Sequence, residues 1–144
     1  MADVFIYHVK KAGFVGSRLY PLNSIKDKLP AVYEAEARKY QGREWLMNVK
    51  LPVLDCLWND VLHFSLMHPS VIYQHLTDVG IDYSKRDLLW FEVPLADVVG
   101  QPCVLYTNSR EDRSGREFPA SDFEPVTEAR VRELAYMPER NLRY

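Results

Sequence analysis

The chain has 144 residues, of which 47% are hydrophobic and 26% are charged. This composition is typical of a folded protein, because it supplies enough apolar surface to offset the conformational entropy lost on folding. The length predicts a single domain over residues 1–144. Basic and acidic residues nearly balance, with a formal net charge of -2, which argues against general binding of nucleic acid or of anionic membranes.

Targeting signals are not recognisable in the sequence. Met1 is not followed by a basic segment and an apolar run, and no stretch approaches the roughly 18 apolar residues of a membrane span. The two cysteines, Cys56 and Cys103, lie far apart among apolar neighbours, which favours reduced core thiols over a disulfide or a metal pair. We therefore expect a cytoplasmic protein that makes no membrane contact.

The first half of the chain predicts one strand and one well-defined helix. Residues 3–9 have the period-2 arrangement of a buried strand, which should place His8 on one strand face and Tyr7 on the other. Pro30 suits the first turn of a helix that runs to about Tyr40, where Gly42 supplies a stop. Residues 43–58 fit neither the helical nor the strand period.

The second half predicts three strands and two helices, in the order of an α+β fold. We expect a single mixed or antiparallel sheet with helices packed on it. The predicted elements are a strand over 60–66, a helix from Pro69 to about Val79, strands over 87–93 and 102–107, a solvated loop over 108–117 and a last helix over 127–135.

Four polar side chains within the predicted strands are candidates for chemistry. His8 ends an apolar strand, where its imidazole could bind ribose hydroxyls or remain a hydrogen-bonded core residue. His63 and Ser65 share a strand face, which could enter a cleft or lie exposed at a sheet edge. Glu92 interrupts an apolar strand, so it is expected to be salt-bridged, functional or at an exposed strand end.

Other patterns for site chemistry are less specific. Carboxylate and imidazole groups at Asp60, His63, His68 and His75 could bind a divalent ion, but their spacing matches no recognised motif, and no metal is expected. The tryptophans and tyrosines are not interleaved with lysine and arginine along the sequence, which favours core packing over a nucleic-acid groove.

The order of strand motifs resembles that of small ADP-ribosyltransferase-like domains, including the DNA-modifying toxin branch and the RNA 2'-phosphotransferase-like branch. The similar pieces span residues 4–107. They are Ile6-Tyr7-His8-Val9, Leu62-His63-Phe64-Ser65 followed by Pro69, Leu89-Trp90-Phe91-Glu92-Val93-Pro94-Leu95 and Val104-Leu105-Tyr106.

This resemblance implies a function and a set of site residues. The implied function is binding of NAD or a related nucleotide, with transfer of ADP-ribose to a protein or nucleic-acid acceptor. His8 would contact NAD, Ser65 with His63 would occupy the second-strand position, and Glu92, Glu117 or Glu124 would be the acid. The sequence lacks the Ser-Thr-Ser element and the Gln/Glu-x-Glu turn of that superfamily, so a relative that has lost the transfer chemistry is also compatible with it.

A non-catalytic interaction module is the alternative. In that interpretation the aromatic segment from Trp45 to Trp58 and the tail from Tyr136 to Tyr144 form a docking surface for another protein. The two hypotheses differ in one geometric requirement: nucleotide transfer needs His8, His63 or Ser65, and a glutamate to face one cleft.

Overall fold

The computed structural model describes residues 3–11, 14, 16–81, 89–107 and 117–135. These residues form helices and small antiparallel sheets, which confirms the α+β class. Contacts along the chain divide it into two compact units, each assembled from separate stretches of sequence. Unit 1 comprises Met1–Gly16, His63–Cys103 and Val126–Tyr144, and unit 2 comprises Ser17–Leu62 and Val104–Pro125.

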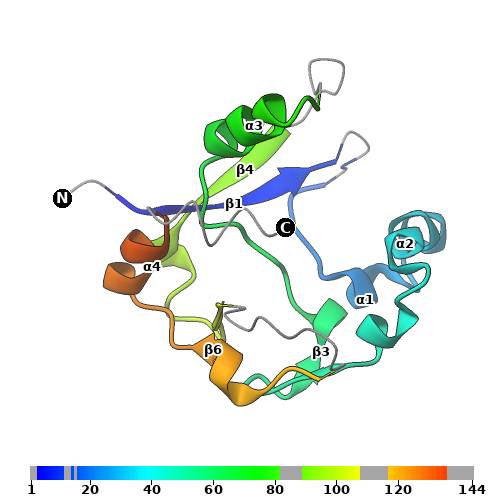
Figure 1. Ribbon diagram of the computed structural model, residues 1–144. Coiled ribbons are helices and arrows are strands. Elements are labelled where there is room, and N and C mark those ends of the chain that lie inside the picture. The colour runs from blue at the N-terminus through cyan, green and yellow to red at the C-terminus, as the bar shows by residue number, and fades with distance from the viewer. Residues whose placement is uncertain (1–2, 12–13, 15, 82–88, 108–116, 136–144) are drawn as a thin grey trace. The chain divides into compact units, whose positions relative to one another are not determined.

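Unit 1 is built on one antiparallel strand pair, β1 (Phe5–Lys10) and β4 (Leu89–Pro94), which Figure 1 shows side by side. The register places Tyr7 opposite Glu92 and His8 opposite Phe91. Residues directly opposite one another share a face, and successive residues alternate between faces. Tyr7 and Glu92 therefore lie on one face of the pair, and His8 and Phe91 lie on the other.

The helices of unit 1 differ in how they are anchored. α3 (Pro69–Asp78) begins at a proline, as predicted, and the Nδ1 atom of His68 caps it by accepting the Ser70 backbone N–H at 3.1 Å. α4 (Glu128–Ala135) buries Val131 and Leu134, which are three residues apart and so lie on one helix face. A short 3₁₀ helix, η4 (Leu95–Asp97), follows β4.

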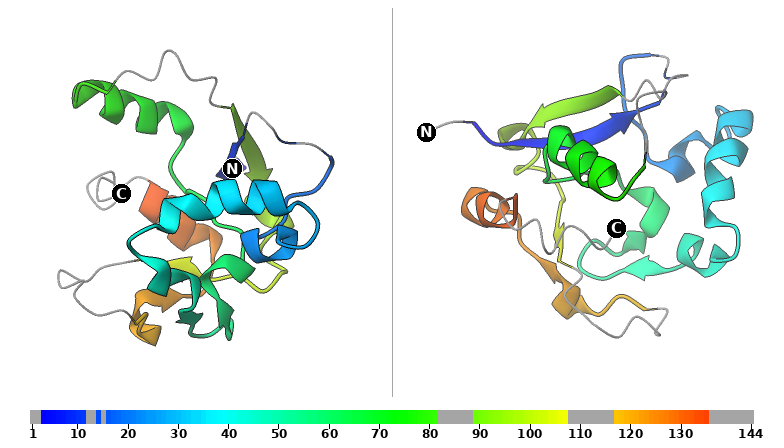
Figure 2. Two further views of the ribbon diagram at one scale, coloured as in Figure 1. Left: turned by 90° about the vertical axis from the view of Figure 1, so that its right-hand side faces the viewer. Right: turned by 45° about the horizontal axis from the view of Figure 1, so that its top comes forward.

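Unit 2 contains most of the helical turns, and Figure 2 shows α1 beside α2. Pro30 occupies the first turn of α2, as predicted, and the following 3₁₀ turn extends the helical segment to Tyr40. Gly42 then adopts a φ of 85°, which ends the segment because L-residues with side chains disfavour that conformation. The elements are α1 (Leu22–Ile25), α2 (Pro30–Ala37), η1 (Arg38–Tyr40), η2 (Glu44–Met47), η3 (Trp58–Asp60) and η5 (Ala120–Asp122).

Two short hairpin-like pairs complete unit 2. β2 (Lys50–Leu51) pairs with β3 (Cys56–Leu57), and β5 (Leu105–Tyr106) pairs with β6 (Phe123–Glu124), both antiparallel. The turn between β2 and β3 carries two non-glycine residues with positive φ, Val53 at 70° and Asp55 at 54°.

The prediction of a single sheet is wrong, because the described residues form three separate two-stranded sheets. The expected strand over 60–66 is replaced by η3 and by a single bridge between Ser65 and Tyr7. The Ser65 hydroxyl bonds the Met67 backbone, and the chain enters α3 at Pro69, so this segment turns away before it can extend the β1–β4 pair. In the part of the chain that is described, no helix is both long and apolar enough to cross a bilayer.

Candidate functional site

His8 is held in one orientation by a neighbouring segment of unit 1. Its Nδ1 atom lies 2.7 Å from the carbonyl oxygen of His63, and its ring lies 5.5 Å from that of Phe64. A carbonyl can only accept a hydrogen bond, so Nδ1 carries a proton, and in the tautomer protonated at Nδ1 alone the Nε2 atom is an acceptor. The imidazole is half-buried, which leaves part of the ring accessible to a ligand.

The surroundings of His8 are aromatic and cationic. Phe91 lies opposite His8 in the register, and Lys10 places its ammonium group 5.7 Å from the Phe91 ring centre. The ring of Phe14 meets Phe91 edge-on at 5.1 Å. We call these side chains, together with Phe64, the His8 face of unit 1.

The opposite face of the strand pair centres on Tyr7. Its backbone exchanges two hydrogen bonds with Ser65, at 2.9 and 2.7 Å. The His68 ring meets the Tyr7 ring edge-on at 5.2 Å. Burial raises the pKa of Tyr7, and the negative charge and hydrogen bond of Glu92 raise it further.

The Ser65 hydroxyl is committed to a local turn. It accepts the Met67 backbone N–H at 3.1 Å and lies 3.3 Å from the Met67 carbonyl oxygen, to which it donates. This arrangement closes the turn between the Ser65 bridge and α3. A serine hydroxyl that donates to a backbone carbonyl has no adjacent base in this geometry, so its observed bonds are structural.

The residues predicted from the resemblance are brought together only in part. His8 contacts His63 through the backbone carbonyl of His63, whose side chain is exposed. Glu92 and Ser65 lie on the Tyr7 side of the strand pair, whereas His8 lies on the other side. The register therefore separates His8 from Glu92, which does not satisfy the requirement that both face one cleft. The alternative acids, Glu117 and Glu124, both belong to unit 2.

Unit 2 contains an aromatic cluster that the sequence pattern did not reveal. Trp58 and Phe118 stack with ring centres 5.1 Å apart and an interplanar angle of 7°. Tyr106 meets both of these rings nearly perpendicularly, and Phe123 packs against Tyr106 at 5.2 Å. Offset stacked and edge-on pairs are favourable arrangements of aromatic rings, so the cluster stabilises a unit with very short strands. Its members come from separate stretches of the sequence, and no periodicity marks them.

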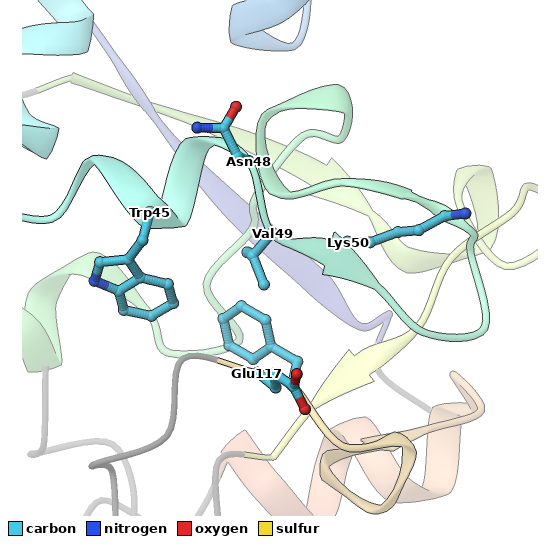
Figure 3. Close-up of a pocket in the computed structure, with 6 residues that line it drawn as sticks. Trp45, Asn48, Val49, Lys50 and Glu117 are labelled. Carbon is cyan, nitrogen blue, oxygen red and sulfur yellow. The ribbon is translucent and has the colours of Figure 1, made fainter.

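A hollow beside this cluster has a volume of about 470 Å³. Figure 3 shows Trp45 and Val49 at the hollow, with the Lys50 side chain extending away from them. The Lys50 ammonium group pairs with Asp55 at 2.7 Å. The lining includes a carboxylate at Glu117 and the stacked Phe118, so the hollow combines aromatic walls with a mixed polar rim.

A buried hydrogen bond crosses the centre of unit 2. The Tyr40 hydroxyl donates to Oδ1 of Asn59 at 2.7 Å, and both residues are almost fully buried. The Nδ2 group of Asn59 has no hydrogen-bond partner among the residues described. Burial raises the pKa of Tyr40, as it does that of Tyr7.

Two of the residues considered for metal binding, Asp60 and His68, have other partners. Asp60 accepts hydrogen bonds from the Asn23 amide at 2.7 Å and from the Leu57 backbone at 2.9 Å, and His68 caps α3. Within the described ranges, no three His, Cys, Asp or Glu side chains gather as a metal site would require. Burial also raises the pKa of the Cys56 thiol, which disfavours the reactive thiolate.

Comparison with known proteins gives no relative from which a site could be transferred. No family model matches the chain, and neither curated protein sequences nor solved structures give a match.

Proposed function

We propose that unit 1 binds NAD or a related nucleotide at the His8 face. The observation that carries this proposal is the 2.7 Å bond from His8 to the His63 carbonyl. That bond orients the ring and, in the tautomer protonated at Nδ1, makes Nε2 able to accept a hydrogen bond. A ribose hydroxyl is such a donor, and a fixed acceptor loses little conformational entropy when the ribose binds.

The neighbours of His8 suit the other parts of a nucleotide. The rings of Phe14 and Phe91 offer apolar surface for stacking of a base, and the Lys10 ammonium group lies above Phe91. An ammonium group is a common partner for phosphate oxygens. Stacking surface, a phosphate partner and a ribose acceptor therefore lie on one face of the same strand pair.

Transfer of ADP-ribose is the reaction that we propose for the bound nucleotide. The glycosidic bond between nicotinamide and its ribose breaks, and nicotinamide leaves with the bonding electrons. The ribose carbon then bonds to a nucleophile of a protein or nucleic-acid acceptor, whose proton passes to a carboxylate. Glu92 is separated from His8 by the strand register, so Glu92, Glu117 and Glu124 have to be distinguished by substitution.

Binding is tested by calorimetric titration of NAD into the full chain. We expect the His8→Ala variant to bind NAD about three- to tenfold more weakly, which corresponds to loss of one hydrogen bond. His75 lies on α3 and is not part of the β1–β4 pair. His75→Ala therefore serves as the matched control and should bind NAD as the wild type does. Wild-type protein that releases no heat and gains no thermal stability with NAD would overturn the proposal.

Transfer is tested separately, by release of nicotinamide from NAD. Each carboxylate is replaced by its amide, in the variants Glu92→Gln, Glu117→Gln and Glu124→Gln. The acid of the reaction is the residue whose replacement stops nicotinamide release while NAD still binds. Binding without release in the wild type would restrict the function to nucleotide recognition and contradict the transfer step.

Protein docking is a second candidate function, and one observation favours it. Val53 is 70% exposed at the turn between β2 and β3, in a backbone conformation that a branched side chain disfavours. Trp58, which was expected to belong to a docking surface, packs instead in the aromatic cluster, and the Tyr136–Tyr144 tail lies outside the described residues. Light scattering over a range of concentrations tests self-association, and Val53→Ser should abolish any association through this turn.

A further inference from the structure

The two faces of the β1–β4 pair differ in charge. Glu92 lies on the Tyr7 side, whereas the described strand residues of the His8 face include one lysine, Lys10, and no carboxylate. The Lys10 ammonium group contacts the Phe91 ring, and within the described residues it has no ion-pair partner. Its positive charge is therefore available to an anionic ligand.

The His8 face has polar groups on one strand and apolar groups on the other. His8 and Lys10 lie two residues apart on β1, and the register places them opposite Phe91 and Leu89 on β4. Leu89 is 59% exposed, so a planar group that covers it removes apolar surface from water. A nucleotide has the same two parts, because an apolar base face adjoins a polar ribose and phosphate.

The spacing of these groups fits one nucleotide unit. Residues on the same face of a strand are about 7 Å apart, so His8 and Lys10 are placed to meet a ribose hydroxyl and the phosphate of the same nucleotide. NAD carries a second ribose, a second phosphate and a second ring. The described strand residues of this face provide one imidazole, one cation and one aromatic ring, that of Phe91. They therefore offer partners to one nucleotide unit of NAD and not to the other.

We propose that the His8 face recognises a single ribonucleoside 5'-phosphate, whatever its base. This inference rests on the proposed nucleotide site, and it adds that the second half of NAD contributes no affinity. The imidazole of His8 accepts from a ribose hydroxyl, Lys10 pairs with the phosphate, and Phe91 packs against the base. Base identity is not read, because the other described strand residues of this face have aliphatic side chains, which offer no hydrogen bond to a base edge.

A series of ligands tests the proposal by calorimetric titration into the full chain. AMP, GMP and NAD should bind with dissociation constants within about threefold of one another. Adenosine, which lacks the phosphate, should bind about two- to fivefold more weakly than AMP, as expected for one ion pair at a protein surface. The 2',3'-dideoxy analogue of AMP, which lacks both ribose hydroxyls, should bind about three- to tenfold more weakly than AMP.

Substitutions assign each part of the ligand to a residue. In Lys10→Ala, adenosine and AMP should bind equally, because the phosphate has lost its partner. In His8→Ala, AMP and its dideoxy analogue should bind equally for the same reason. Lys26 makes a comparable contact in unit 2, where its ammonium group lies 5.6 Å from the Tyr33 ring centre, so Lys26→Ala is the matched control and should keep both differences. A Lys10 or His8 variant that keeps its wild-type difference would contradict the corresponding contact.

The same titrations separate this inference from the proposed function on which it rests. NAD that binds more than about tenfold tighter than AMP would show that both nucleotide units are recognised. That result overturns the inference and leaves NAD binding in place. AMP that binds more than about tenfold tighter than GMP would show that the base is read, which also overturns the inference. Absence of binding by all of these ligands would overturn the proposed function itself.

Discussion

Tyr7 and Glu92 face each other across the β1–β4 pair, and the Glu92 carboxylate helps to raise the pKa of the Tyr7 hydroxyl. Tyr7 is 8% exposed, whereas Glu92 is exposed. The pair therefore joins a buried ring to a solvated charge at the centre of unit 1. Glu92 thus lies on the face opposite His8.

Replacement of this hydroxyl should destabilise the protein slightly. We expect Tyr7→Phe to lower the free energy of unfolding by about 0.5–1.5 kcal/mol, because the polar interaction of the Tyr7 hydroxyl with Glu92 is lost while Glu92 can be rehydrated. Tyr20 is 45% exposed, so Tyr20→Phe is the matched control and should change stability little. Urea denaturation measures both variants, and equal stability of the two would contradict the role of the Tyr7 hydroxyl.

The raised pKa of Tyr7 also predicts a dependence of stability on alkaline pH. The unfolded chain loses the Tyr7 proton near pH 10, before the folded protein does, so the free energy of unfolding falls as the pH rises from there to the folded pKa. Tyr40, whose pKa is raised too, adds a decrease of the same sign. We expect a smaller alkaline loss in Tyr7→Phe than in the wild type, measured by urea denaturation below and above pH 10. An unchanged loss would contradict this account.

The Ser65→Ala variant tests whether the Ser65 hydroxyl has a structural or a catalytic role. Its hydroxyl bonds the Met67 backbone, so Ser65→Ala should lower the free energy of unfolding by about 1 kcal/mol and leave NAD affinity within twofold of the wild type. Thermal denaturation and calorimetry measure the two effects. Unchanged stability with loss of nicotinamide release would instead assign Ser65 to the reaction.

His68 should be required at the start of α3. Its Nδ1 atom accepts the Ser70 N–H, and loss of such a cap lowers stability by about 1 kcal/mol. We expect faster hydrogen exchange in the first turn of α3 for His68→Ala, and near-normal exchange for His68→Asn, because asparagine can provide the same acceptor. Equal exchange in His68→Ala and the wild type would show that the cap does not stabilise the helix.

The turn between β2 and β3 should be improved by glycine. Val53 has a φ of 70°, which a β-branched side chain adopts only with strain. We expect Val53→Gly to raise the free energy of unfolding by about 0.5–1 kcal/mol, since relief of this strain exceeds the added freedom of the unfolded chain. The neighbouring residue Leu54 does not have a positive φ, so Leu54→Gly should be destabilising. Thermal denaturation that shows the reverse order would contradict this conformation.

Local signals in the sequence located several elements correctly. Pro30 and Pro69 begin α2 and α3, and short apolar runs located β1 and β4 within about two residues. Propensity and proline position act over a few residues, so they can be read from a short window of sequence.

Strand pairing and the candidate site could not be predicted in the same way. The register of the β1–β4 pair places His8 and Glu92 on opposite faces. It joins residues that are about 80 positions apart in the chain, and no periodicity in the sequence specifies that pairing. The bond between Ser65 and Met67, which turns the chain out of the expected strand, is equally invisible in the alternation pattern. The aromatic cluster around Trp58 and Phe118 likewise joins residues from distant segments.

The most direct test of nucleotide binding at the His8 face is the nitrogen NMR spectrum of the His8 imidazole, recorded with and without NAD. We expect Nδ1 to carry the proton in the free protein, because it donates to the His63 carbonyl, and Nε2 to shift when NAD is added, because it accepts from the ribose. A proton on Nε2 in the free protein, or an imidazole spectrum that millimolar NAD leaves unchanged, would contradict the account.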